Sequence, residues 1–182
     1  LEVFHGKQDS KAVATAWPHL GHQDRFIRAA ARTALEHQPV AEWKKKALAE
    51  TNVSVQLEAL LALTRVEGSK KESATRDAIF AALLKHNYGK LAPEQRLSYA
   101  RLIQIDLKRF GDPDEATLAA IAAKLDAAYP ADSFEENWLL TETLAYLQAP
   151  NTAAKAMALI QAAPSQEPQM EYARSLRFLK TG

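Results

Sequence analysis

Apolar residues along this chain recur at spacings of three and four, the pattern of helices that bury one face. One such series is Ala100, Ile103, Leu107 and Phe110. Glycine and proline residues fall between these series rather than inside them, where they would break a helix. Ten helices are predicted, over residues 9–20, 24–37, 40–50, 54–66, 71–87, 94–110, 114–128, 134–148, 151–162 and 166–180.

Residues that start helices support these segments. The pairs Ser69–Glu72, Asp112–Glu115 and Ser133–Glu136 have capping-box spacing, in which a side-chain oxygen accepts from the first-turn backbone and the later glutamate reaches back. Proline suits the first helical turn because its missing N–H would be unpaired there anyway. The prolines expected in first turns are Pro39, Pro93 and Pro113.

The predicted helices pair into five antiparallel hairpins, and the first two hairpins resemble each other. Residues 26–35, FIRAAARTAL, align with residues 55–63, VQLEALLAL, at an offset of 28 residues. Repeated hairpins that bury a face against their neighbours form an α-solenoid. We therefore expect one all-α repeat domain over residues 1–182, a HEAT/armadillo-like α-solenoid of about five hairpins. An irregular helical bundle is the structural alternative.

Composition narrows the function classes. The chain has 182 residues, with 23 lysines and arginines against 22 acidic residues, so no overall basic field indicates nucleic-acid binding. Charges interrupt every apolar run before the roughly 20 residues that a membrane helix needs. The chain has no cysteine, which excludes thiolate metal ligands, cysteine catalysis and c-type haem attachment within it. No cofactor and no membrane insertion are expected.

The segment LGHQDRFIRAAARTAL, residues 20–35, resembles the second helix of a HEAT repeat. Residues 4–39, 129–150 and 169–180 resemble the helical-repeat segment of large exported bacterial proteins that also carry a β-propeller of the sugar-dehydrogenase type and a c-type cytochrome module. The resemblance implies a scaffold or docking module, exported or periplasmic, whose partners are other domains of the same protein or another protein. Haem or dehydrogenase chemistry would belong to neighbouring domains. Because the chain begins at Leu1, we expect a piece of a larger or processed protein.

Arginines are concentrated on the second helix of each predicted hairpin, which in a HEAT-like solenoid lines the concave side. Nine of the ten arginines lie there, whereas lysines favour the first helices. Seven are candidates for partner binding or inter-repeat pairing: Arg25, Arg28, Arg32, Arg65, Arg101, Arg174 and Arg177. The second helices also carry enough acid to pair most of them: Asp24, Glu36, Glu58, Asp106, Glu142 and Glu171. Two interpretations stay open, an anion-binding surface and bonds that hold neighbouring repeats in register.

The helix over 24–37 shows how its residues would divide their tasks. Asp24 is the expected cap, and Arg32 with Glu36 has the i,i+4 spacing that pairs on one helix. The expected buried stripe is Phe26, Ile27, Ala30, Ala31, Ala34 and Leu35.

The remaining histidines, glutamates and aromatic residues are expected to have structural roles rather than catalytic or metal-binding ones. Four histidines, His5, His19, His22 and His37, crowd the N-terminal part, but their spacing matches no metal motif. Glu135 and Glu136 fall in a first helical turn, where negative charge favours the helix dipole, so with Glu142 they are not expected to be catalytic. The large aromatic residues sit among leucines at helical spacing and are expected to pack between helices. They are Trp17, Trp43, Trp138, Tyr99, Tyr129, Tyr146 and Tyr172.

These observations predict a non-catalytic helical-repeat scaffold or protein-interaction module. One alternative is an enzyme on HEAT-like repeats that acts on nucleic acid, of the DNA-alkylation glycosylase type; the near-zero net charge argues against it. Another is a carbohydrate-binding helical module, which would require exposed tryptophans.

Overall fold

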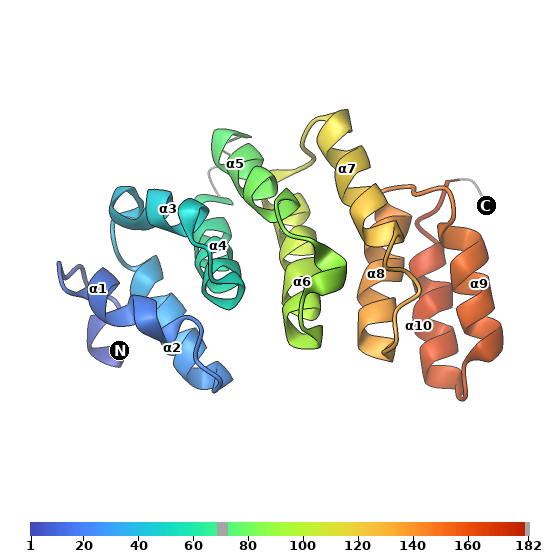
Figure 1. Ribbon diagram of the computed structural model, residues 1–182, viewed down its shortest axis with the longest axis horizontal. Coiled ribbons are helices and arrows are strands. Elements are labelled where there is room, and N and C mark those ends of the chain that lie inside the picture. Colours follow the sequence, from blue (N-terminus) through green and yellow to red (C-terminus); the bar gives the residue numbers. More distant parts are fainter. Residues whose placement is uncertain (69–72, 181–182) are drawn as a thin grey trace. The chain divides into compact units, whose positions relative to one another are not determined.

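A computed structural model describes residues 1–68 and 73–180. Over these residues the protein has ten α helices, short 3-10 turns and no strand, which confirms the all-α prediction (Figure 1). The α helices are α1 (Ala12–Ala16), α2 (Arg25–Glu36), α3 (Val40–Ala49), α4 (Val53–Glu67), α5 (Ser73–Leu84), α6 (Pro93–Phe110), α7 (Glu115–Asp126), α8 (Phe134–Tyr146), α9 (Thr152–Ala162) and α10 (Gln166–Leu176). The 3-10 turns are η1 (Glu2–Phe4), η2 (Trp17–His19) and η4 (Tyr88–Lys90).

Helix ends differ from the prediction by three or more residues at three places, and by at most two residues elsewhere. The expected helix over 9–20 is the short α1 followed by η2, because Pro18 cannot donate to a continuing α-helical ladder. The helices expected to end at residues 87 and 180 end earlier, at Leu84 and Leu176. Local periodicity continues past both points, so the pattern overestimates their lengths.

The predicted caps are partly correct. The Ser133 hydroxyl accepts from the Glu136 backbone N–H at 3.2 Å, as expected, although the Glu136 carboxylate binds elsewhere. The prediction for Asp112–Glu115 was wrong, since Asp114 caps α7 by accepting from the Thr117 N–H at 2.9 Å.

The prediction that three prolines lie in first helical turns is also partly correct. Pro93 opens α6 as predicted. Pro39 is the N-cap residue of α3, and Pro113 precedes α7, so each lies just outside the turn expected to contain it. The pair Ser69–Glu72 lies outside the described residues.

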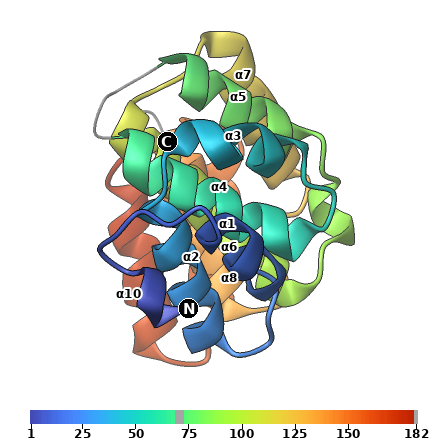
Figure 2. The ribbon, with the colours of Figure 1, turned by 90° about the vertical axis from the view of Figure 1, so that its left-hand side faces the viewer.

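The chain divides into two compact units. Unit 1 comprises Leu1–Lys85 with Ile105–Gly111, and unit 2 comprises His86–Gln104 with Asp112–Gly182, so α6 contributes residues to both. In unit 1, α1 packs on α2 and α3 packs on α4, while α2 also packs on α4 (Figure 2). Its core contains fully buried Trp43, Leu60, Leu63, Ile79 and Phe80.

Unit 2 contains two further packed pairs, α7 with α8 and α9 with α10, and α8 also packs on α10. Buried Tyr88 and Tyr99 meet edge to face with ring centroids 5.4 Å apart, and Leu140, Leu144 and Tyr172 complete the interior. In both units the second helix of one pair therefore contacts the second helix of the next pair.

Helices α2 and α4 correspond in their caps as well as in their sequences. Asp24 accepts from the Phe26 N–H at 2.7 Å, and Asn52, at the aligned position, accepts from the Val55 N–H at 3.3 Å. Each cap satisfies an otherwise unpaired first-turn donor. The similarity noticed in the sequence therefore extends to where each helix begins.

The predicted buried stripe of α2 is correct for three of its six residues. Ala31, Ala34 and Leu35 are fully buried, whereas Ile27 and Ala30 are half-buried and Phe26 is 70% exposed. Helical side chains lean toward the N-terminus, so a first-turn ring projects beyond the packed part of its helix. The Phe26 ring contacts the Arg25 guanidinium rather than a core side chain; the guanidinium lies 4.8 Å from the ring centre.

Candidate functional site

Arginines and glutamates join α2 to α4 in unit 1. Arg32 Nη1 lies 2.6 Å from Glu58 Oε2, and Arg28 Nε lies 3.3 Å from Glu58 Oε1. A further pair has its arginine on α4 and its glutamate on α2, since Arg65 Nε lies 2.6 Å from Glu36 Oε1. Arg32 Nε is 3.5 Å from the same Glu36 oxygen. We call these five residues the α2–α4 ladder, since they link the two helices at successive turns.

Partial burial strengthens the α2–α4 ladder. Glu36 and Glu58 have side chains only 14% and 17% exposed, and Arg32 is 20% exposed. Charge-assisted bonds of this length, partly shielded from water, are stronger than pairs on an open surface. Arg28 Nη1 also donates to the carbonyls of His22 and Gln23, at 2.8 and 2.9 Å. Three of the seven candidate arginines are therefore bonded to carboxylates of this unit.

The remaining candidates are placed differently. Arg101 Nη1 donates to Gln104 Oε1 at 2.8 Å, and the Gln104 amide in turn donates to Glu142 Oε2 at 3.1 Å. Arg174 lies a longer 3.8 Å from Glu171, one turn away on the same helix.

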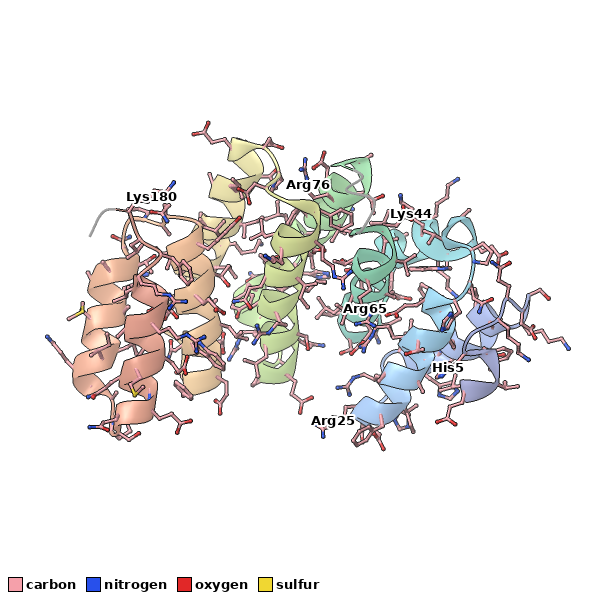
Figure 3. All side chains as sticks on the ribbon, turned by 180° about the vertical axis from the view of Figure 1, so that it is seen from behind. His5, Arg25, Lys44, Arg65, Arg76 and Lys180 are labelled. Atoms are coloured by element: carbon pink, nitrogen blue, oxygen red, sulfur yellow. The ribbon has the colours of Figure 1, made fainter. Side chains whose placement is uncertain are left out.

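Two arginines stack on the next residue in the chain. Arg177 lies over the Phe178 ring at 4.9 Å, and among the described residues it has no carboxylate within ion-pair distance. Arg25 is arranged in the same way over Phe26 and stands at the first turn of α2 (Figure 3). Of the seven arginines, the four of α2 and α4 lie in unit 1 and the other three lie in unit 2.

Two of these arginines line an open pocket on unit 2. The pocket has a volume of about 90 Å³ and is formed by α8, α10 and the residues that follow α10. Trp138 forms one side, and its ring stacks on Phe134 with centroids 6.3 Å apart. Phe134 also meets Tyr172 edge to face at 5.9 Å, which fixes this aromatic wall. The lining residues are Trp138, Glu142, Glu171, Arg174, Ser175, Arg177 and Phe178.

The glutamates considered for catalysis have separate partners. Glu136 is 2% exposed and accepts from Arg96 Nε at 3.0 Å and from the Tyr88 hydroxyl at 3.0 Å. Burial, followed by the nearby Glu136 charge, raises the pKa of Tyr88 above its ordinary value. Glu142 accepts from Gln104, whereas Glu135 is exposed in the first turn of α8. Glu136 is thus the anion of a buried ion pair that sequence reasoning missed.

A second buried carboxyl group was also misjudged. Asp106, expected to pair with an arginine, is fully buried in unit 1 and accepts from the Thr64 hydroxyl, while its other oxygen, Oδ2, has no hydrogen-bond partner. Burial raises the pKa of Asp106 to about 8, although the bond from Thr64 opposes the shift. The sequence holds the signal for this burial, because Asp106 lies on the apolar face that Ile103, Leu107 and Phe110 define.

The histidines form two separate pairs. His5 and His37 have ring centroids 6.4 Å apart, and His19 and His22 lie 6.5 Å apart. His5 Nε2 is 2.9 Å from the Ala30 carbonyl oxygen, and His22 Nδ1 accepts from the Asp24 N–H at 3.0 Å. Within residues 1–68 and 73–180, no three metal-ligating side chains are grouped so that they could hold an ion.

Most of the large aromatic residues pack in the interior, as predicted. Trp43 is fully buried, and Trp17 is 7% exposed with its indole N–H donating to Glu50 Oε2 at 2.8 Å. Hydrogen bonds from the Asn52 backbone and from Trp17 lower the pKa of Glu50. Trp138 is half-buried at the pocket of unit 2, and Tyr146 is 50% exposed, with its hydroxyl donating to Asp112 at 2.8 Å.

No helix in the described part of the chain has the length and apolar character needed to cross a membrane. Comparison with protein-family models, with curated proteins and with solved structures finds no match to this chain.

Proposed function

We propose that the chain is a HEAT-like helical-repeat module without catalytic activity, which acts as a scaffold and protein-interaction segment of a larger bacterial protein. The observation that carries this proposal is the α2–α4 ladder, which ties the second helices of two similar helix pairs to each other. Packing of α8 on α10 in unit 2 repeats that relation between second helices. Stacked helix pairs of this kind form solenoids that offer extended binding surfaces.

Polar bonding in the two units supports a structural use of most of the charged groups. Arg28, Arg32 and Arg65 are engaged by carboxylates, so fewer guanidinium groups are available for a nucleic-acid backbone. Trp17 and Trp43 are buried, so of the three tryptophans only Trp138, half-buried beside the pocket of unit 2, has a ring that a ligand could reach. The nucleic-acid enzyme therefore gains no supporting observation, and the carbohydrate-binding module has one accessible tryptophan rather than an exposed set.

The partner that best fits the remaining groups is a protein segment with acidic and apolar residues. Arg177 is a cation without a carboxylate partner among the described residues, and it lies beside Phe178, which is 46% exposed. Arginine and aromatic residues are enriched among the residues that dominate protein interfaces. The resemblance described above further motivates proposing an exported, multidomain parent protein.

Peptide binding tests this function. Three labelled peptides of about a dozen residues, each with a central phenylalanine, would carry glutamate, glutamine or lysine at the other varied positions. We expect the acidic peptide to bind with a Kd of about 10–100 μM in low salt, and several-fold more weakly near 0.3 M salt, as measured by fluorescence anisotropy. Single-stranded DNA of similar charge is the control polyanion. Tighter binding of the DNA, or equal binding of all three peptides, would contradict the proposal.

A further inference from the structure

We propose that the pocket between α8 and α10 receives one acidic side chain of a protein partner, with Arg177 as the pairing cation and Trp138 and Phe178 as the apolar contact for the neighbouring residue. This inference rests on the proposed interaction function and gives it a location and a chemistry. None of the sequence patterns indicated this pocket, because its residues come from two helices and from the segment after α10.

The size of the pocket restricts its occupant. Sites for small-molecule cofactors and drug-sized ligands usually measure roughly 300–1,000 Å³. The pocket has about 90 Å³ and an open mouth, which suits a single side chain of a segment lying across the surface. The expected partner is therefore a protein chain rather than a free metabolite.

Charge around the pocket favours an acidic side chain. The pocket is lined by two glutamates and two arginines, but they are not equivalent. Glu142 already accepts from Gln104, and Glu171 faces Arg174 at 3.8 Å. Arg177 has no carboxylate partner among the residues described, so its guanidinium is available to a ligand carboxylate, while Glu142 keeps its charge but has one oxygen occupied by the Gln104 amide.

Exposure also favours the arginines as the groups that a partner meets. The Arg174 side chain is 65% exposed, whereas that of Glu171 is 28% exposed. A lysine on the partner would have to reach the more buried glutamates past the guanidinium groups, at the cost of like-charge repulsion. An acidic side chain would meet the arginines directly.

Aromatic residues supply the apolar part of the contact. Phe178 is 46% exposed and open to a ligand, and Trp138 is held by its stacking on Phe134, so the indole can pack on a ligand with little loss of freedom. Ser175 is not offered as a ligand donor, since its hydroxyl already donates to the Glu171 carbonyl at 2.9 Å. The pocket thus combines an unpaired cation with a fixed aromatic wall.

A pair of charge-reversal variants tests this assignment with the acidic peptide above. Arg177→Glu is expected to weaken binding about tenfold, and Arg177→Lys about threefold, because lysine keeps the charge but loses the planar fork. Arg25→Glu is the matched control, since Arg25 also stacks on the following phenylalanine but lies in the other unit. It is expected to leave the Kd within about twofold.

A second measurement uses the unaltered protein and does not depend on how a variant folds. Addition of the acidic peptide is expected to shift the NMR signal of the Trp138 indole N–H and to leave those of buried Trp17 and Trp43 in place. An unmoved Trp138 signal at saturating peptide would overturn the assignment.

The outcomes separate the inference from the proposed function. Equal weakening by Arg177→Glu and Arg25→Glu would mean general electrostatic attraction, so the pocket assignment would fail while an acidic partner would stand. Preference of the unaltered protein for the lysine peptide would overturn the assignment, because the glutamates of the pocket would then be the binding groups. Absence of binding to every peptide would overturn the proposed interaction with acidic segments itself.

Discussion

Replacement of Asp106 by asparagine is expected to stabilise unit 1 at pH 8 by about 2 kcal/mol or more and to remove most of a pH dependence that the unaltered protein shows. Asp106 is fully buried and one of its oxygens has no hydrogen-bond partner, so the ionised form is poorly solvated. Asparagine has nearly the same shape, keeps an acceptor for the Thr64 hydroxyl and never ionises.

The direction of the pH dependence follows from the raised pKa. In the folded protein the pKa of Asp106 is raised from 3.8 to about 8, so between these values the native state keeps a proton that the unfolded state releases. The free energy of unfolding contributed by this residue is therefore greatest below about pH 4 and falls as the pH rises through about 8.

Urea unfolding followed by circular dichroism at a series of pH values measures this effect. Asp132→Asn is the control, because Asp132 is exposed and should leave the dependence on pH unchanged. If Asp106→Asn lowers stability at pH 8, or if the slope between pH 4 and 8 persists in the variant, Asp106 does not carry the buried proton.

Replacement of Arg96 by methionine is expected to cost about 3–5 kcal/mol of unfolding free energy, the second large effect. Glu136 is 2% exposed, and its carboxylate oxygens accept from Arg96 and Tyr88. Loss of the guanidinium leaves a buried charge whose one remaining side-chain hydrogen-bond donor, among the described residues, is the Tyr88 hydroxyl. That loss is more costly than loss of the pair as a whole.

Removal of both partners distinguishes this cause from simple loss of packing. The double variant Arg96→Met with Glu136→Leu should recover a substantial part of the lost stability, as measured by urea unfolding. Arg101→Met is the control, since Arg101 is exposed and is expected to change stability by no more than about 0.5 kcal/mol. A double variant less stable than Arg96→Met alone would show that the unpaired charge of Glu136 is not the cause of the lost stability.

Local features of this protein could be predicted from its sequence to the extent that they depend on neighbouring residues. Helical periodicity located ten helices, and Asp24 and Ser133 were recognised as caps because a cap bonds two or three residues further on. Asp114 was missed in favour of Asp112, since the two acidic residues flank Pro113 and either spacing resembles a cap.

Side-chain partners that are distant in the sequence could not be predicted from it. Glu136 fits a capping box, and no residue near it in the chain indicates that the side chain is buried. Its partners, Arg96 of α6 and Tyr88 of η4, are distant in the sequence. Phe26 fits the apolar period of α2, but it lies in the first turn of the helix, and its ring is 70% exposed. The partners of the arginines likewise depend on which helices pack together.

The arginines illustrate both sides of this limit. Their concentration on second helices, and the supply of glutamates beside them, were visible in the sequence and raised both structural pairing and ligand binding. The structure places Arg32 between Glu36 and Glu58 and leaves Arg177 beside an open pocket, which gives each interpretation its own residues.

A double-mutant cycle between Arg32 and Glu58 tests most directly whether charged pairs hold neighbouring second helices together. Urea unfolding of Arg32→Ala, Glu58→Ala and the double variant is expected to give a coupling energy of at least about 1 kcal/mol. The control cycle of Arg25 with Glu58, which share no bond in the structure, should be additive within about 0.5 kcal/mol. Additivity of the Arg32–Glu58 cycle as well would contradict the α2–α4 ladder as the link between these two helices.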